Sequence, residues 1–344
     1  MNILIVDDPD YEPTRVFLIG APRSGTTWLQ RMLGAHEAIV TGQETDFFDG
    51  YLKHWVALWN KQFPHEEERT QFRRFKGLPS IITQTEFSQL LKIAVDFVHA
   101  RLLALKPTAR VILEKNPGYS LCTELIEQCV PDAKFIHVVR DGRDVATSLV
   151  AASKGWGKFW APREVEKAAA VWRRYADAAR RLVTSDQYLE VRYEDISTDG
   201  PRVLAQCFDF CGVPCTYEDC VKIVAAYRFD SVAKTSIGER VANESIMWGG
   251  EVARRFGAYP PEPPGFFRAG ASGGWRADWG EHDRWTFNKV AGELLMQLGY
   301  EKNDAWVNID GRRRMVLAAQ EAFWGRVTKA RRRIGHVLSA LGVG

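Results

Sequence analysis

The sequence predicts an α/β protein with a three-layer, P-loop-like fold, in which a central parallel β-sheet is flanked by helices. Two observations carry this prediction. Short runs rich in β-forming residues alternate with stretches of helical apolar spacing, and a glycine-bounded loop joins the first such pair. Strands that alternate with helices form βαβ units, whose crossovers make the strands parallel. Because ligands of such sheets bind at the carboxyl ends of the strands, we expect the functional residues in the loops that follow them.

The four predicted strands follow one another in a regular order. They cover residues 15–20, 111–114, 134–139 and 188–192. A polar or glycine-rich loop follows each strand, and helical spacing then begins, as at residues 26–33 and 121–129. All four loops are therefore expected at the same edge of the sheet.

Charge and hydropathy exclude several classes of protein. Across 344 residues, 46 Lys and Arg oppose 43 Asp and Glu, so the net charge of +3 provides no field for binding nucleic acid. Any anion site must be local. The first eight residues carry Asp7 and Asp8 where a secretion signal carries positive charge, and no apolar run is long enough to cross a bilayer. We expect a cytoplasmic protein.

A cluster of four cysteines raises the question of a metal site. Cys207, Cys211, Cys215 and Cys220 lie close together in the sequence, but no two of them are separated by two residues, as zinc ligands commonly are. The histidines also show no spacing typical of a metal pair. Buried free thiols are the preferred interpretation, and no metal is expected.

The chain is predicted to consist of one large domain, residues 1–311, and a basic amphipathic helix, residues 312–344. In the second segment basic clusters alternate with apolar residues at spacings of three and four, which predicts one apolar stripe. Three roles remain open for this helix: packing on its own domain, forming a homodimer, or contacting an anionic membrane surface at the periphery.

The loop after the first strand has the glycine spacing of a P-loop. Its string GAPRSGTTW, residues 20–28, places backbone N–H groups at a helix start, where they surround a phosphate. A nucleotide triphosphatase has Lys directly after the second glycine, whereas this chain has Thr26 there and keeps a cation two residues before that glycine, at Arg23. This change suits a donor with a single 5′-phosphate that carries a sulfuryl group. Taken alone, such a loop could equally be a tight strand-to-helix connection.

The string PRSGTTW resembles the 5′-phosphosulfate loop of the sulfotransferase superfamily, which uses 3′-phosphoadenosine-5′-phosphosulfate (PAPS), and the overall likeness is to bacterial-type members. The resemblance implies that PAPS is the co-substrate, that 3′-phosphoadenosine-5′-phosphate (PAP) is the product, and that no metal is required. It also implies that Trp28 lies beside the adenine and that the 5′-phosphosulfate is bound by the residues preceding it: Arg23, Ser24, Gly25, Thr26 and Thr27.

A second anion site is predicted after the third strand. Arg140 ends that strand and Ser148 follows eight residues later on the next helix, so both can reach one anion. In the superfamily the matching positions bind the 3′-phosphate of the donor. The alternative is a surface salt bridge of Arg140 or Arg143 with a neighbouring acid, which would contribute little.

Three further segments extend the resemblance. Tyr193 matches a tyrosine that lies by the adenine, and Phe229 occupies the place of an aromatic next to the base. Arg268 and Gly270 match the late loop that closes over the 3′-phosphate. In that loop Ala269 replaces the usual Lys, which leaves its finer contacts undefined.

The residue that accepts the proton is predicted from a third string. Many small-molecule sulfotransferases use a histidine that this chain lacks, since residues 114–117 read EKNP. The string GQETDFFD, residues 42–49, is similar to the glutamate-containing loop of glycan and protein-tyrosine sulfotransferases, which implies that Glu44 is the base. Lys115 is the matching cation and, with Arg23, stabilises the sulfuryl group and the leaving phosphate. Asp46 replaces a family histidine and either tunes the base or binds the acceptor.

These observations predict a PAPS-dependent sulfotransferase whose acceptor is a sugar, a lipid-linked molecule or another small molecule. A hydroxyl is the preferred acceptor group, and an amine is the second choice. Variable loops build the acceptor pocket, so the sequence does not identify the acceptor. Two alternatives remain: a P-loop small-molecule kinase, which should carry Lys in place of Thr26, and a non-catalytic nucleotide-binding module. Glu44 could also be an exposed loop carboxylate, and Lys115 could simply pair with a nearby acid.

Overall fold

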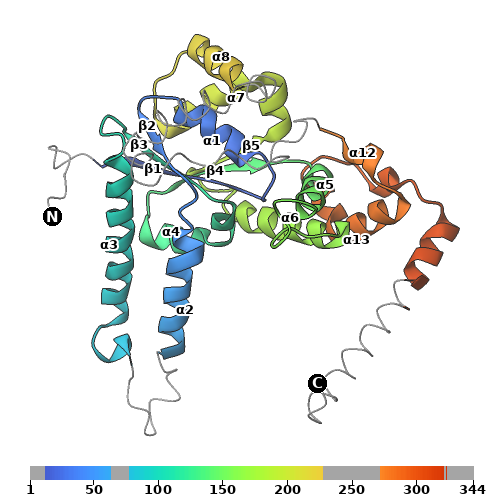
Figure 1. Cartoon of the computed structure of the whole chain (residues 1–344), viewed down its shortest axis with the longest axis horizontal. Coiled ribbons are helices and arrows are strands. Elements are labelled where there is room, and N and C mark those ends of the chain that lie inside the picture. Colours follow the sequence, from blue (N-terminus) through green and yellow to red (C-terminus); the bar gives the residue numbers. More distant parts are fainter. Residues whose placement is uncertain (1–11, 63–76, 228–271, 321–322, 324–344) are drawn as a thin grey trace, which may run out of the picture.

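A five-stranded parallel sheet forms the centre of the computed structural model (Figure 1), which describes residues 12–62, 77–227, 272–320 and 323. The strand order is β2-β3-β1-β4-β5, and every neighbouring pair is parallel. The strands are β1 (Thr14–Gly20), β2 (Ile39–Thr41), β3 (Val111–Lys115), β4 (Lys134–Val139) and β5 (Tyr188–Arg192). The predicted α/β fold is confirmed, and four of these strands match the predicted runs.

The strand order reverses at β1, and this reversal determines where a ligand can bind. The chain leaves β1 toward β2 and β3 on one side, and later forms β4 and β5 on the other. Leu18 pairs with Lys115, and Gly20 pairs with Val138, so the carboxyl ends of β1, β3 and β4 lie at one edge. A crevice outside such a switch point is where open α/β sheets bind ligands.

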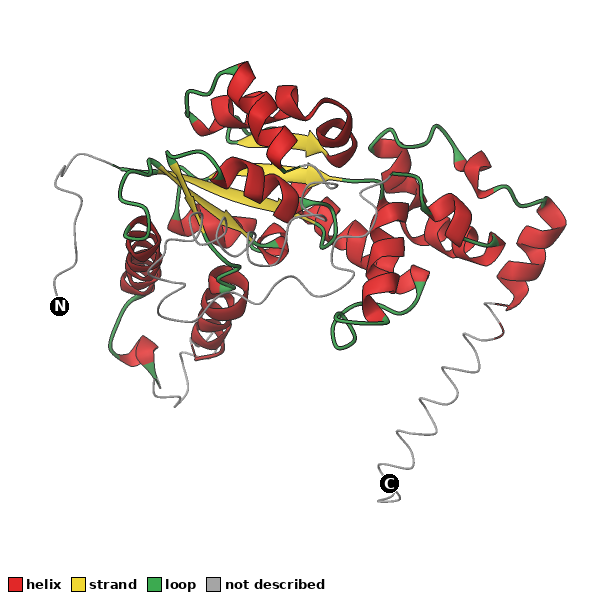
Figure 2. Ribbon diagram, turned by 45° about the horizontal axis from the view of Figure 1, so that its top comes forward, coloured by secondary structure: helices red, strands yellow, loops and turns green. Residues whose placement is uncertain are grey.

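Helices cover both faces of the sheet, as Figure 2 shows. Alternate residues of β1 point to opposite faces: Val16 and Leu18 pack into one core cluster, and Phe17 and Ile19 into another. The first cluster includes residues of α1 (Thr26–Gly34) and α7 (Tyr193–Cys211), with α8 (Tyr217–Ala226) packed beside them. The second cluster includes residues of η1 (Phe47–Leu52), α2 (Lys53–Gln62), α3 (Gln84–Leu103), η4 (Pro117–Leu121) and α4 (Thr123–Cys129).

A third core cluster lies at the carboxyl ends of β1 and β4, since it includes Ala21 and Val139. It is built around Trp172 and Phe287, which are both almost fully buried. The helices are α5 (Gly142–Ser153), α6 (Val165–Arg180), α12 (Trp275–Asp278) and α13 (Glu281–Gln297), followed by η5 (Asp304–Val307). This cluster supports α5, the helix on which Ser148 was predicted.

The helices α2 and α3 project together away from the sheet (Figures 1 and 2). A stacked pair of rings, Trp59 of α2 and Phe87 of α3, joins them with centroids 4.3 Å apart. The short helix η3 (Leu78–Ser80) precedes α3, which begins with a capping box formed by Thr83 and Glu86. We refer to α2, η3 and α3 with Tyr51 as the limb.

The structure shows the state of the cysteines, and its described residues show whether metal-binding clusters or membrane-spanning helices are present among them. All six cysteines are free thiols, and burial raises the pKa of Cys211 to about 12, which keeps that thiol protonated and inert. The described ranges contain neither a cluster of three potential metal-ligating His, Cys, Asp or Glu side chains nor a helix of the length and apolarity that crossing a bilayer requires. Most of residues 312–344 lie outside the described residues, so the two-part division of the chain and the role of its last segment stay predictions.

Candidate active site

The loop between β1 and α1 has the backbone geometry of an anion-binding turn. Gly25 caps α1 with φ 100°, and Arg23 adopts φ 75°, a left-handed conformation that costs a non-glycine residue free energy. A Cβ atom on Gly25 would lie 2.4 Å from the ring of Tyr193, so only glycine fits there. The first N–H groups of α1 have no partner within the helix and point into this loop. The loop therefore provides the partial positive charge that favours a phosphate.

Ser24 supplies a test of whether an anion fits this loop. Its side chain is 1% exposed, yet among the described residues its Oγ atom has no hydrogen-bond partner. A buried hydroxyl without a partner costs free energy, because such groups are almost always paired in proteins. A bound oxyanion beside the loop would satisfy it. Ser24 thus fits the predicted 5′-phosphosulfate.

The two predicted anion sites are in direct contact. Arg23 donates from Nε to Oγ of Ser148, at 3.1 Å, and Arg140 donates from Nη1 to the carbonyl oxygen of Arg23, at 3.2 Å. These residues lie more than a hundred positions apart in the sequence but meet at the edge formed by β1 and β4. Arg23 thus links Ser148 and Arg140, and the convergence of Arg140 and Ser148 on one anion stays a prediction.

Aromatic side chains line the same place. The guanidinium of Arg140 lies 4.0 Å from the ring centre of Tyr193, and the Trp28 ring lies 5.7 Å from the Tyr193 ring. The indole N–H of Trp28 donates to the carbonyl oxygen of Tyr227 at 2.8 Å. Trp156 lies over the guanidinium of Arg23 at 5.2 Å. Arginine and aromatic faces of this kind suit a nucleotide that has phosphates and a base.

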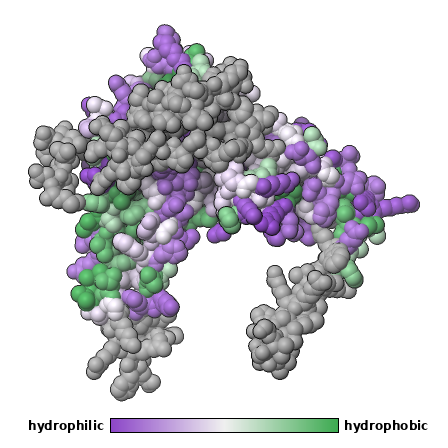
Figure 3. Space-filling view, in the orientation of Figure 1, coloured by the Kyte–Doolittle hydropathy of each residue, from purple (hydrophilic) through white to green (hydrophobic). Residues whose placement is uncertain are grey.

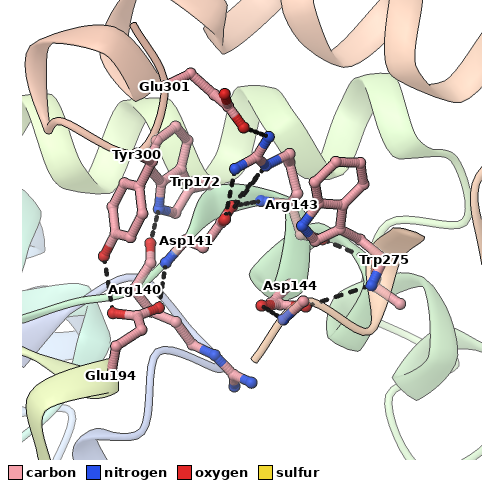
Figure 4. A network of polar contacts seen from close by, with 11 residues as sticks. Arg140, Asp141, Arg143, Asp144, Trp172, Glu194, Trp275, Tyr300 and Glu301 are labelled. Atoms are coloured by element: carbon pink, nitrogen blue, oxygen red, sulfur yellow. Dashed lines mark hydrogen bonds and ion pairs between the residues drawn. The ribbon is translucent and has the colours of Figure 1, made fainter. Parts of the chain in front are cut away.

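Arg143 plays a different role from Arg140 (Figure 4). Its side chain is 1% exposed, contacts the carboxylate of Glu301 and donates to Asp141 at 2.8 Å. Its guanidinium also contacts the rings of Trp275, at 4.1 Å, and Trp306, at 4.7 Å. Burial opposes the charge, but the hydrogen bonds to Asp141 and Glu301 outweigh it and raise the pKa of Arg143. The salt bridge considered as an alternative thus forms at Arg143, inside the protein.

This buried network holds the backbone that carries Arg140. Glu194 accepts the N–H of Asp141 at 3.0 Å and the hydroxyl of Tyr300 at 3.0 Å, and burial raises the pKa of Glu194. Trp172 donates its indole N–H to the carbonyl oxygen of Arg140 at 3.2 Å. Sequence reasoning missed these partners, although Glu194 belongs to the string that singled out Tyr193. Their contacts fix the start of α5 and hence the direction of the Arg140 side chain.

Asp144 ties α5 to the segment before α12 (Figure 4). Its carboxylate accepts the N–H groups of Gly273 at 2.7 Å and Trp275 at 3.4 Å. Burial raises the pKa of Asp144. The predicted contributions of Arg268, Gly270 and Phe229 fall outside the described residues and remain predictions.

The predicted base and its cation form an ion pair. Lys115 ends β3 with 7% of its side chain exposed, and its ammonium contacts a carboxylate oxygen of Glu44, whose side chain is 42% exposed. Lys115 thus pairs with an acid, as the alternative interpretation held, and that acid is the predicted base Glu44. Next to this pair, Asn116 donates to Asp46 at 2.7 Å. The structure brings Glu44 and Lys115 together at the carboxyl end of β3.

A buried network behind this pair was not predicted. The carboxylate of Glu114 contacts Nε2 of His99 at 2.7 Å and accepts from the hydroxyls of Thr45, at 2.7 Å, and Tyr119, at 3.1 Å. Burial, followed by the negative charge of Glu114, raises the pKa of Tyr119. Because Thr45 directly follows Glu44, this network anchors the chain that carries the predicted base.

Comparison with known proteins agrees with this geometry. Residues 13–219 match the model of a family described as Sulfotransferase family. The chain is 30% identical to a putative protein-tyrosine sulfotransferase of Caenorhabditis briggsae over 135 residues, which is 39% of this chain and 42% of that protein. It is also 25% identical over 253 residues to an uncharacterized protein of Aquifex aeolicus, over 71% of this chain and 31% of that protein. The chain therefore spans less than half the length of either relative.

A solved structure supports the fold. The crystal structure of the mouse sulfotransferase SULT7A1 complexed with PAP superposes with a TM-score of 0.52 and 15% identity, over 83% of this chain and 85% of that one. At this identity the likeness concerns the fold alone.

Proposed function

This chain belongs to the sulfotransferase family, and we propose that it transfers a sulfuryl group from PAPS to a hydroxyl group of an acceptor. The observation that carries the proposal is the meeting of Arg23, Arg140 and Ser148 at the switch point of the sheet. A donor with one phosphate group at its 5′ side and another at its 3′ side needs two adjacent anion sites. The mouse sulfotransferase of similar fold was crystallised with PAP, which has these two groups.

Each half of the donor has residues that suit it. We assign the 5′-phosphosulfate to the start of α1, with Arg23, Ser24, Gly25, Thr26 and Thr27. The unpaired hydroxyl of Ser24 supports this assignment. Arg140 and Ser148 would hold the 3′-phosphate, since guanidinium groups bind phosphate oxygens with strong, charge-assisted hydrogen bonds. Trp28 and Tyr193 offer aromatic faces for the adenine.

The transfer step needs a base and a cation, which the Glu44–Lys115 pair provides. In the proposed reaction the acceptor oxygen attacks sulfur as its proton passes to the carboxylate of Glu44. The bond between sulfur and the bridging oxygen of the 5′-phosphate breaks, and PAP leaves with the electron pair. Lys115 and Arg23 stabilise the negative charge that develops on the leaving phosphate. No metal ion is needed for this balance.

The ion pair must open before Glu44 can act. In the structure the ammonium of Lys115 contacts the carboxylate oxygen of Glu44 that would have to accept the acceptor's proton. A phosphosulfate placed beside Lys115 competes for the ammonium. Glu44 is 42% exposed and regains water when the pair opens, while the buried Lys115 exchanges one anionic partner for another, so its ammonium is not left unpaired.

The acceptor class is proposed from the loop around Glu44. Its likeness to glycan sulfotransferases favours a hydroxyl of a sugar, a lipid-linked molecule or another small molecule. A phenolic hydroxyl is a second candidate, because relatives such as the Caenorhabditis briggsae protein are named as protein-tyrosine sulfotransferases. Both candidates use the same base and cation.

Calorimetry and a transfer assay together test the proposal. We expect the wild type to bind PAP at micromolar concentration and ATP with magnesium much more weakly, and to transfer labelled sulfate to a sugar or phenolic acceptor. Glu44→Gln should bind PAP normally but lose transfer by about a hundredfold or more, because general bases contribute about 10²–10⁴-fold.

Each other outcome identifies an alternative. Tight magnesium-dependent ATP binding would instead indicate the small-molecule kinase. PAP binding without transfer to any acceptor would indicate the non-catalytic module. Full activity of Glu44→Gln would show that another residue accepts the proton.

A further inference from the structure

Exposed apolar side chains are concentrated on the limb. Of the seventeen large hydrophobic residues exposed in the described part of the chain, eight lie between residues 51 and 97. Figure 3 shows apolar side chains gathered over α2 and α3. These eight residues are Tyr51, Trp55, Leu58, Leu78, Ile81, Leu90, Ile93 and Phe97. Such a patch on a protein of ordinary composition marks an interaction surface.

The exposed side chains follow the helical repeat. On α3, Leu90, Ile93 and Phe97 are spaced by three and four residues, which places them on one face. The buried residues of α3 form a separate stripe that includes Leu91 and Val95. On α2, Trp59 is buried while Trp55 and Leu58 are exposed. Both α2 and α3 therefore carry exposed apolar residues that the described core does not cover.

Basic residues border this apolar surface. From Tyr51 to Gln62 the charged side chains are Lys53 and Lys61, with His54 between them, and this stretch has no acid. On α3, Lys92 and Arg101 are exposed. These two charges are balanced by the acids of α3, Glu86 and Asp96, so the excess positive charge of the limb comes from α2.

We propose that the limb docks on the surface of an anionic lipid bilayer. Tryptophan and tyrosine favour the boundary between lipid and water, and the surrounding lysines favour anionic headgroups. A second copy of the chain fits less well, because a symmetric dimer would bring the same basic borders together. The limb begins close to the active site, since η1 starts three residues after Glu44 and continues into α2. A bilayer bound there would present a lipid-borne hydroxyl near the proposed base.

Vesicle sedimentation tests this inference without any donor or acceptor, so its failure would leave the proposed sulfuryl transfer untouched. The probes are phosphatidylcholine vesicles with and without phosphatidylserine. The wild type should sediment with the mixed vesicles, and Trp55→Ser/Ile93→Ser/Phe97→Ser should bind them about tenfold or more weakly, because it removes three apolar anchors. The control Tyr217→Ser/Val221→Ser changes two exposed apolar residues of α8 and should bind like the wild type.

A second variant keeps the test decisive if the triple variant does not fold. Lys53→Glu/Lys61→Glu leaves the apolar residues in place and should weaken binding to mixed vesicles by about fivefold or more for each charge, since a lysine near an anionic surface is worth about 1 kcal/mol. If the wild-type protein sediments with neither kind of vesicle, the inference is overturned. A concentration-dependent dimer that the triple variant abolishes, without vesicle binding, would show that the limb is a subunit interface.

Discussion

Replacing Arg140 with alanine should weaken the binding of PAP but leave the binding of AMP almost unchanged. AMP has the same base and 5′-phosphate as PAP but no 3′-phosphate. If Arg140 holds the 3′-phosphate, its removal matters only for the ligand that has this group. Any general disturbance, such as the loss of the contacts with the Arg23 carbonyl or the Tyr193 ring, weakens both ligands alike.

The expected size of the effect follows from the charge of the two partners. A hydrogen bond to a charged group contributes about 1.5–3 kcal/mol. Since about 1.4 kcal/mol is a tenfold change in affinity, PAP should bind about 10- to 150-fold more weakly to Arg140→Ala. The wild-type advantage of PAP over AMP should shrink by the same factor.

Calorimetric titration of both ligands measures this difference. Arg202→Ala is a matched control, because Arg202 is a half-exposed arginine paired with Asp199 on the surface of α7. Arg23→Ala should weaken PAP and AMP together, as expected for a residue at the 5′ side. Equal losses of PAP and AMP in Arg140→Ala would refute the assignment of Arg140 to the 3′-phosphate.

Three further predictions concern stability and protonation. Burial raises the pKa of Glu194 above 4.5, so its stabilising contribution is complete below pH 4.5 and is lost as pH rises through the folded-state pKa. Glu194→Gln should remove this loss of stability. The melting temperature of the variant, relative to that of the wild type, should therefore rise between pH 4 and pH 7. Gly25→Ala should lower the free energy of unfolding in urea by about 2 kcal/mol or more, because its Cβ would clash with Tyr193. Gly212→Ala is the control, since Gly212 also has a positive φ but lies in open space, and it should lower the free energy of unfolding by only about 1 kcal/mol. Equal losses would contradict the close contact at Gly25. Burial lowers the pKa of His137 to about 3, so its ring resonances should not shift between pH 8 and 5 in an NMR titration, where an ordinary histidine titrates near pH 6.5.

The sequence predicts those features that depend on local strings at strand ends. Arg23, Arg140, Ser148 and Tyr193 are brought together as expected, because each follows or lies near the carboxyl end of a strand that the hydrophobic pattern identifies. The three-residue strand β2 was missed, since a run that short shows no period.

Contacts between distant residues could not be predicted. Arg143 meets Glu301 across 158 positions, and nothing in the local sequence distinguishes it from Arg140 or from a surface arginine. The same holds for Glu114, whose contacts with His99 and Thr45 depend on how α3 and the Glu44 loop pack against β3. Tertiary packing decides which charges are structural and which are free to meet a ligand.

The two ion pairs of the site differ in what it costs to break them, and this difference indicates which one the donor rearranges. Arg143 is 1% exposed, and removing a partner from a buried pair costs about 3–5 kcal/mol, so its contacts with Asp141 and Glu301 should persist throughout the proposed reaction. In the Lys115–Glu44 pair the carboxylate is 42% exposed and can return to water, and the phosphosulfate would replace it as the anionic partner of the buried Lys115. A phosphosulfate can therefore replace Glu44 as the partner of Lys115, but it cannot break the contacts of Arg143 with Asp141 and Glu301. In the proposed reaction the base is thus released only when the donor is in place, while the scaffold of Arg140 stays fixed.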